Sequence, residues 1–300
     1  MPKLTWRHAA VCVLGLVLSS AGVSWDARAL PNSTSDDADR FPFVVAVEYN
    51  GRLICSGTVL YPRIVVTAAH CLQQLRLWRG KRIYMNAYLP PEDLSVRVVQ
   101  NGVAKTYAVA EVAIAPEWLA SSSYQQSGDG LPYDLSLLIT EEPIDVRLPL
   151  AGLEAEAPLV PGSPAGAGGH RGVLVGFGGV RCPAPNECPD AGVRRYVHVA
   201  MKEGTACFKS RIDREKGLPG KVWCTDSLVL PGDSGGALMI EAPDGTLQFA
   251  GVISAQRGLP PEFRSLASWQ QSAAAPLGLN RDFVLKRARA LGYAPVTPDP

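Results

Sequence analysis

Apolar residues along this chain gather in short runs rich in β-branched side chains, a pattern that predicts strands. The stretch FPFVVAVEYNGRLICSGTVLYPRIVVTAAHC (41–71) breaks its runs at Asn50-Gly51, at Ser56-Gly57 and at Tyr61-Pro62. Asn50-Gly51 between two apolar runs predicts a two-residue hairpin, and Asp244-Gly245 predicts another. Similar runs continue to about residue 255, so strands are expected over most of the chain.

Helical periodicity is scarce before the C-terminus. In NRDFVLKRARALG (280–292), Val284, Ala288 and Leu291 recur at helical spacing and Gly292 follows as a stop signal. Many short strands followed by one helix predict an all-β barrel or sandwich with a C-terminal helix docked on it. A Pro-, Gly- and Ala-rich segment at 151–169 predicts a linker between two halves of similar length.

The composition agrees with a loop-rich β protein. The chain has 300 residues, of which 47% are hydrophobic and 19% charged, with 29 glycines and 25 prolines. This length is enough for one large domain or two small lobes with a core. The net charge of +1 gives no electrostatic reason to expect nucleic acid as a partner.

Residues 1–29 have the order of a secretory signal peptide. Lys3 and Arg7 precede an apolar stretch, and small residues then lead to an A-x-A site that ends at Ala29. We expect cleavage after Ala29, which gives a secreted, extracellular chain that begins at Leu30 and has no membrane attachment. The alternative is an uncleaved anchor, although the apolar stretch is short for a membrane span.

Cleavage would remove Cys12 and leave an even number of cysteines. In an exported chain this predicts three disulfides, for which the sequence alone allows fifteen pairings. The chain contains no C-x-x-C pair. We therefore expect no zinc or other metal site, and no cofactor. The remaining cysteines are Cys55, Cys71, Cys182, Cys188, Cys207 and Cys224.

Three segments carry the groups that acyl transfer requires. A serine hydroxyl needs a neighbouring base, and histidine suits that role because its ordinary pKa is about 6.5. Ser234 in PGDSGGAL, His70 in VVTAAHC and Asp134 in YDLSLLI supply a nucleophile, a base and a carboxylate to hold the imidazole. Gly232 and Gly236 permit a tight turn that aims the N–H groups of Gly232 and Ser234 at a developing oxyanion. Taken singly, each segment also fits a turn, a cap or a structural histidine.

The motifs TAAHC (67–71), DLSLL (134–138) and GDSGG (232–236) resemble, in this order, the three active-site motifs of the chymotrypsin/trypsin-like serine endopeptidases. The resemblance extends over residues 30–292. It implies an all-β fold of two six-stranded antiparallel β-barrels with a C-terminal helix. The first barrel would cover about 30–150, the second about 170–280 and the helix about 280–292, with a tail at 293–300.

The resemblance implies a role for each residue named above. Ser234 would be the nucleophile, His70 the base and Asp134 the group that orients His70. The amides of Gly232 and Ser234 would form the oxyanion hole. Polypeptides would be the substrates and protein inhibitors a further class of partner, with the protein a monomer.

Disulfide pairings also follow from the resemblance. It implies a Cys55–Cys71 bridge beside the histidine and a Cys207–Cys224 bridge elsewhere. Cys182 and Cys188 remain, and they would close a small local loop that the family does not explain.

Two features depart from the family pattern, and the first concerns activation. Members of the family usually pair a newly freed amino group with the aspartate before the serine, here Asp233. Aligning Phe41-Pro42 with the family's aromatic-Pro places Leu30 at the new N-terminus, so we expect signal cleavage itself to supply that amino group. Cleavage after Arg40 is the alternative, but it leaves too short a segment to reach Asp233.

The second departure is in the specificity pocket. Leu228 stands where the family places the residue at the pocket floor, and Leu230 replaces a cysteine that braces the pocket. The family's Ser-Trp-Gly wall is here Ser254, Ala255 and Gln256, of which Gln256 adds bulk. We therefore expect a preference for an uncharged residue before the scissile bond.

Two other functions compete with a secreted endopeptidase. The altered pocket also fits a non-catalytic binding protein on the same scaffold, since a fold does not fix its function. The G-x-S-x-G pattern at 232–236 occurs in α/β-hydrolase esterases, but their chain order is Ser, Asp, His. The order His70, Asp134, Ser234 and the lack of strand–helix alternation therefore disfavour the esterase.

Overall fold

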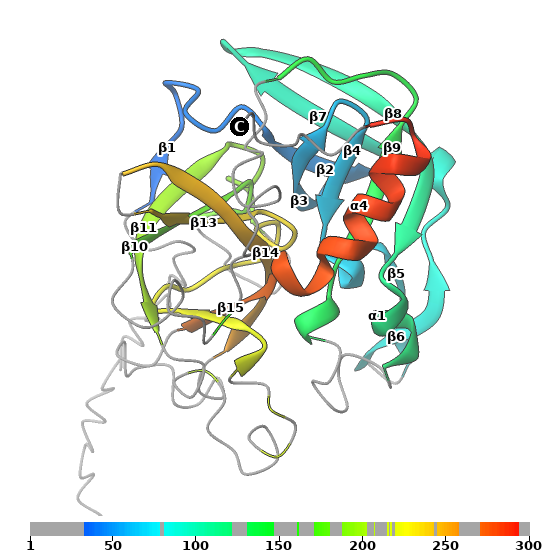
Figure 1. The fold of residues 1–300 in the computed structure, drawn as a ribbon. Helices are drawn as coiled ribbons and strands as arrows, with labels where there is room; N and C mark the ends of the chain where they lie inside the picture. The colour runs from blue at the N-terminus through cyan, green and yellow to red at the C-terminus, as the bar shows by residue number, and fades with distance from the viewer. Residues whose placement is uncertain are drawn as a thin grey trace, which may run out of the picture.

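Most strands of the computed structural model fall into two groups that lie beside each other (Figure 1). The predicted signal segment, Leu30, Cys182 and the residues after 293 lie outside the described part of the chain, as does the predicted linker apart from residue 161. The described residues are 33–78, 81–121, 131–146, 161, 171–180, 188–202, 207, 215, 217, 220–242, 245–257 and 271–293.

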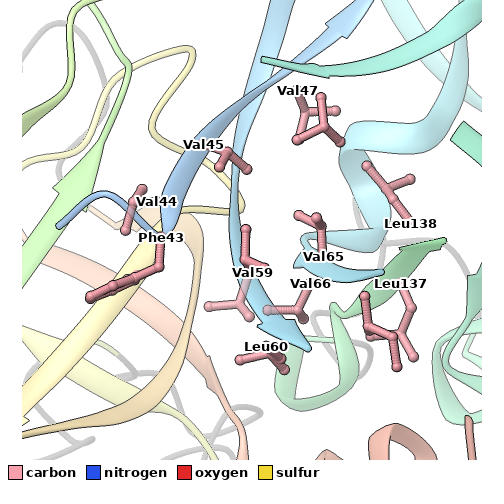
Figure 2. Close-up of a cluster of buried hydrophobic side chains, with 14 of the residues drawn as sticks. Phe43, Val44, Val45, Val47, Val59, Leu60, Val65, Val66, Leu137 and Leu138 are labelled. Atoms are coloured by element: carbon pink, nitrogen blue, oxygen red, sulfur yellow. The ribbon is translucent and has the colours of Figure 1, made fainter. Parts of the chain in front are cut away.

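Six strands of the N-terminal half close an antiparallel barrel in the order β2-β3-β4-β9-β8-β7. Its interior is filled by small and branched apolar side chains, such as the fully buried Val45, Val66 and Leu138 (Figure 2). The predicted hairpin joins β2 to β3, and Asn50 (φ 49°) and Gly51 (φ 70°) both adopt left-handed conformations there. The six strands are β2 (Val44–Tyr49), β3 (Arg52–Tyr61), β4 (Ile64–Thr67), β7 (Leu94–Gln100), β8 (Val103–Ile114) and β9 (Ser136–Thr140).

The second group of strands is also closed. Its order is β11-β10-β13-β14-β15-β12, and β11 pairs with β12 as well, which completes a ring of six antiparallel strands. Leu174, Trp223, Leu238 and Ile253 belong to its own buried core. The expectation of two six-stranded antiparallel barrels is therefore confirmed. The strands are β10 (Arg171–Gly176), β11 (Arg195–Lys202), β12 (Trp223–Thr225), β13 (Ala237–Glu241), β14 (Leu247–Arg257) and β15 (Gln271–Pro276).

The N-terminal strand β1 (Thr34–Ser35) attaches to the second barrel, although the first barrel follows it in the sequence (Figure 1). Thr34 lies opposite Tyr196 and Ser35 opposite Arg195 of β11. The apolar pattern does not predict this pairing, because the strand consists of two polar residues.

A buried ionic cluster holds the segment that follows β1. Arg194 Nε donates to Asp36 Oδ2 at 2.7 Å, and the same guanidinium contacts the carboxylate of Asp39. It also donates to the carbonyl of Val99 in the first barrel at 2.7 Å. Asp36, Asp39 and Arg194, called the Arg194 clamp below, therefore connect the N-terminal segment to both barrels.

The C-terminal helix α4 (Arg281–Ala290) packs against the first barrel (Figure 1). Its predicted face includes Val284 and Ala288, both buried, and the ring of Tyr293 stacks on Tyr61 of β3 with a centroid distance of 5.3 Å. Among the described residues, no helix has the length and apolar character that a membrane crossing requires. The smaller elements are β5 (Gln73–Trp78), β6 (Lys81–Tyr88), α1 (Pro116–Ala120), η1 (Ala69–Leu72), η2 (Pro91–Asp93), η3 (Leu131–Tyr133) and η8 (Gly278–Asn280).

Candidate active site

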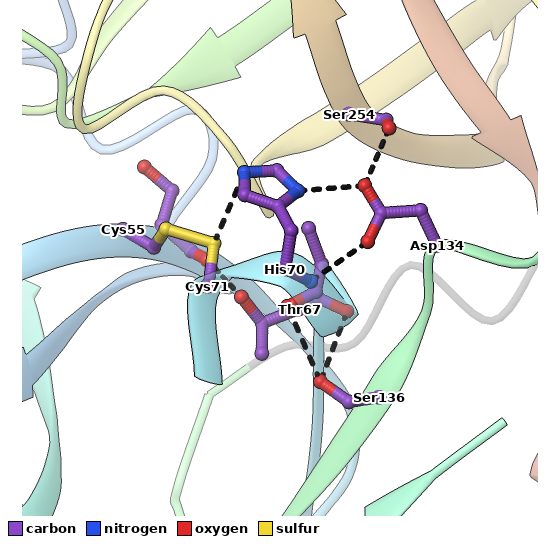
Figure 3. A network of polar contacts seen from close by, with 9 residues as sticks. Cys55, Thr67, His70, Cys71, Asp134, Ser136 and Ser254 are labelled. Atoms are coloured by element: carbon purple, nitrogen blue, oxygen red, sulfur yellow. Dashed lines mark hydrogen bonds and ion pairs between the residues drawn. A yellow bond between two sulfur atoms is a disulfide. The ribbon is translucent and has the colours of Figure 1, made fainter. Parts of the chain in front are cut away.

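His70 lies on a short turn that a disulfide ties to the neighbouring strand. The turn is η1, directly after β4, and Cys71 within it is bonded to Cys55 of β3 with a Cα–Cα distance of 6.1 Å. The backbone N–H of His70 donates to Asp134 Oδ1 at 2.9 Å, and His70 Nδ1 lies 2.7 Å from Asp134 Oδ2 (Figure 3). Two contacts with one carboxylate therefore fix both the backbone and the ring of His70.

Asp134 is fully buried and is contacted from both barrels. It lies between η3 and β9 of the first barrel, and Ser254 Oγ of β14 in the second barrel donates to its Oδ2 at 2.5 Å. Hydrogen bonds to an ionised acceptor are among the strong ones, so the carboxylate is well held. The sequence predicts Ser254 only as part of the pocket wall, since no local pattern connects two residues 120 positions apart.

The other ring nitrogen of His70 faces away from Asp134. His70 Nε2 lies 3.9 Å from Cys71 Sγ. An ionised carboxylate can only accept hydrogen bonds, so Nδ1 carries the proton in the neutral ring. Nε2 is therefore the ring nitrogen that carries the lone pair a base requires.

The turn that carries Ser234 is packed against the segment that leads to His70. Gly235 has a left-handed φ of 85°, and a β-carbon there would overlap the carbonyl oxygen of Ser56 and Oγ1 of Thr67. Only glycine allows so close an approach. The N–H of Ser56 also donates to the carbonyl of Ser234 at 2.7 Å. These backbone contacts place the partly exposed Ser234 beside the histidine segment, far away in the sequence.

Two N–H groups in this turn have no acceptor among the described residues. In the part of the chain that the structure describes, the amides of Gly232 and Ser234 donate no hydrogen bond. Their neighbours do, since Asp233 N donates to Leu230 O at 3.0 Å and Gly236 N to Asp233 O at 2.9 Å. Gly232 adopts a left-handed φ of 101°, which turns the chain at this point. These two donors are the amides that the sequence predicts for an oxyanion hole.

A comparison with protein families identifies the class. Residues 32–263, most of the chain, match the family model described as Trypsin. The chain belongs to the trypsin family. A venom serine protease of Polistes dominula is 31% identical to this trypsin-family protein over 96 residues, which are 31% of this chain and 34% of the relative. Hypodermin-B of Hypoderma lineatum is 35% identical over 65 residues, which are 21% of this chain and 25% of the relative. The matches thus span about a third and a quarter of these two relatives.

Asp233 is the most perturbed carboxyl group of this trypsin-family site. It is fully buried, and its two oxygens accept from the backbone N–H of Gly178 at 2.9 Å and of Leu230 at 3.0 Å. Burial raises the pKa of Asp233 to about 7, although these two hydrogen bonds and the charge of Arg195 act in the opposite direction. Leu30, its predicted partner, lies outside the described residues, so that pairing stays a prediction.

Leu228 and Leu230, the two predicted pocket residues that differ from the family pattern, are both buried and form a small apolar cluster. Ser254 is also buried. The backbones of Ala255 and Gln256 continue β14 and pair with β15. Among the predicted pocket residues whose side chains the structure describes, Ser254 contacts the His70–Asp134 pair.

The disulfides stabilise both barrels of the trypsin-family fold. Besides Cys55–Cys71, a Cys207–Cys224 bond with a Cα–Cα distance of 6.0 Å anchors β12. Cys188 is disulfide-bonded too, but Cys182 lies outside the described residues, so their pairing stays a prediction. Cys55, His70 and Cys71 are clustered closely enough to suggest a metal site. Both sulfurs are in the disulfide, however, and a metal would require thiolates.

Proposed function

We propose that this trypsin-family protein is a secreted serine endopeptidase that uses His70, Asp134 and Ser234 as a catalytic triad. The observation that carries the proposal is the doubly bonded His70–Asp134 pair, beside which the Ser234 turn is docked. The name of the Polistes relative, a serine protease, agrees with this function.

The reaction uses Nε2 of His70, the ring nitrogen that faces away from Asp134. Ser234 Oγ attacks the peptide carbonyl carbon, its proton passes to His70 Nε2, and the carbonyl electron pair moves onto the oxygen. Asp134 stays ionised and stabilises the imidazolium through Nδ1. When the C–N bond breaks, His70 returns the proton to the leaving amine. Water then attacks the acyl carbon with His70 again as base, the ester bond to Ser234 breaks, and His70 returns the proton to Ser234 Oγ.

The amides of Gly232 and Ser234 stabilise the oxyanion that forms in each step. Their lack of an acceptor within the described chain supports this role. Donors that are already in place need no reorganisation when the charge develops, so they favour the transition state over the substrate.

The proposed substrates are polypeptides with an uncharged residue before the scissile bond. Leu228 and Leu230 are apolar and buried, so neither supplies the negative charge that would attract an Arg or Lys side chain. The strand segment of Ser254, Ala255 and Gln256 would form the wall of the same pocket.

Export would complete the site. Removal of residues 1–29 would free the amino group of Leu30, and its charge would offset the burial of Asp233. The position of β1 supports this route, because Ser35 pairs with Arg195, whose charge acts on Asp233. Because β1 begins four residues after Leu30 and lies beside Arg195, the amino group of Leu30 would have only a short span over which to reach Asp233.

Labelling with a fluorophosphonate probe, followed by cleavage-site profiling on a denatured proteome, tests the function. We expect the secreted protein to be labelled and to cleave after uncharged residues, and Ser234→Ala to lose both properties. A wild type that folds but neither reacts nor cleaves would favour the non-catalytic binding protein. Selective cleavage after Arg or Lys would refute the proposed pocket.

A further inference from the structure

Ser56 uses every one of its polar atoms to connect the two sides of the candidate active site. It lies in β3 of the first barrel, next to Cys55, and is fully buried. Its N–H donates to the carbonyl of Ser234 at 2.7 Å, and its own carbonyl accepts from Thr67 Oγ1 at 2.7 Å. The backbone of Ser56 thus joins the nucleophile turn to the strand that leads to His70.

The hydroxyl of Ser56 makes a second connection. Ser56 Oγ accepts from the N–H of Phe177 at 2.8 Å and donates to the carbonyl of Gly232 at 2.6 Å. The direction of both bonds is fixed, because an amide can only donate and a carbonyl can only accept. A single hydroxyl therefore links two segments of the second barrel from a position in the first.

These contacts act on the oxyanion turn itself. Ser56 holds the carbonyls of Gly232 and Ser234, the same two residues whose amides have no acceptor in the described chain. Gly232 has no side chain to restrict its backbone and adopts a left-handed φ of 101°. Without the Ser56 hydroxyl, the peptide after Gly232 would lose the contact that fixes its carbonyl, and only its N–H would stay held, by Leu230.

We propose that Ser56 is a positioning residue that sets the orientation of the oxyanion-hole amides through its side-chain hydroxyl. The proposal rests on the proposed endopeptidase function. Ser56 need not touch the substrate, so its loss should reduce turnover and spare substrate binding.

The test compares Ser56→Ala and Ser56→Gly with the wild type on one peptide amide substrate. Active sites are counted by the end point of fluorophosphonate labelling, and kcat is expressed per labelled site. The affinity of a peptide boronate, which forms a tetrahedral adduct, is measured beside that of the cleaved peptide acid. Thr58→Val is the matched control, because Thr58 lies in the same strand and its buried Oγ1 has no hydrogen-bond partner in the described structure.

We expect Ser56→Ala to lower kcat per site about 10- to 100-fold, somewhat less than the loss of an oxyanion donor itself. KM and the affinity of the peptide acid should stay within about twofold, whereas the boronate should lose affinity by the same factor as kcat. Thr58→Val should match the wild type. A role in folding alone would reduce the number of labelled sites and leave kcat per site unchanged.

Several outcomes would overturn the positioning role. One is a Ser56→Ala variant whose kcat per site equals that of an active wild type. Another is a Ser56→Ala variant in which only KM changes. If Ser56→Ala does not fold, Ser56→Gly decides, since it removes the hydroxyl and leaves no methyl group in the buried site, and a wild-type kcat in that variant counts against the role. A folded wild type without activity would overturn the endopeptidase function, and the positioning role with it.

Discussion

The buried carboxylate of Asp134 depends on one hydroxyl from the other barrel. Ser254 Oγ is one of three donors to this group, beside the backbone N–H and Nδ1 of His70. Ser254→Ala would remove a hydrogen bond to a charged acceptor and loosen the carboxylate that orients His70. We expect kcat to fall about 10- to 100-fold, measured by steady-state hydrolysis of a peptide amide.

Thr225→Val is the control for this substitution. Thr225 lies in the same barrel, and its buried Oγ1 has no hydrogen-bond partner among the described residues, so the change removes a hydroxyl but no bond. Its kcat should equal that of the wild type. If Ser254→Ala hydrolyses the substrate as fast as Thr225→Val, the contact with Asp134 does not contribute to the reaction.

Among the elements, β1 and the segment after it depend on the Arg194 clamp. Arg194→Met would leave the buried Asp36 carboxylate with two donors among the described residues, the N–H groups of Arg40 and Phe41, at 2.9 and 3.0 Å. Breaking a buried ion pair from one side costs about 3–5 kcal/mol, because a buried charge stays behind. We expect a loss of this size in the free energy of unfolding, measured by urea titration.

An exposed ion pair serves as the control for the Arg194 clamp, because breaking it should change the free energy of unfolding much less. Lys105 Nζ and the Glu142 carboxylate are 3.9 Å apart, with 61% and 74% of their side chains exposed. Lys105→Met should change the free energy of unfolding by less than about 1 kcal/mol. Equal effects of the two substitutions would mean that the clamp contributes no more than an exposed pair.

Local pattern was sufficient for some of these elements and insufficient for others. Asn50-Gly51 encodes its own turn, and the face of α4 follows from the spacing of Val284 and Ala288, since neighbours along the chain determine both. Closure into two barrels came from the resemblance, not from periodicity. β1 carries no apolar signal, and the contacts of Ser56 depend on residues far away in the chain, so neither is visible in a local window.

The candidate site is assembled where the two barrels meet. His70 and Asp134 come from the first barrel and the Ser234 turn from the second. The barrels are also joined next to the site, where the guanidinium of Arg97 in β7 lies 5.7 Å from the ring centre of the buried Phe177. The alignment of the catalytic groups therefore depends on how the barrels are docked, and Asp233 lies within that region beside Gly178.

The ionisation of Asp233 should make stability depend on pH. Its pKa is raised from an ordinary value of 3.8 to about 7 in the folded chain. Below about pH 4 the group is neutral in both states and has no effect. Between about pH 4 and pH 7 the unfolded chain loses this proton while the folded chain keeps it, so the free energy of unfolding falls as the pH rises. Above about pH 7 the full penalty is present, on the order of 4 kcal/mol.

An amino group paired with Asp233 would lower that pKa and remove most of the pH-dependent penalty. We therefore expect a chain that begins at Leu30 to keep its free energy of unfolding between pH 4 and pH 7.5, and a chain with one extra residue before Leu30 to lose stability over that range. Urea titrations across the range measure this, and N-terminal sequencing confirms each start. Asp233→Asn is introduced into both chains as the control, because it removes the titration of Asp233 and keeps that of every other group. The two Asp233→Asn chains should therefore have the same dependence of the free energy of unfolding on pH. Identical pH profiles for the two chains would mean that Leu30 does not reach Asp233, and activation would then require another cation.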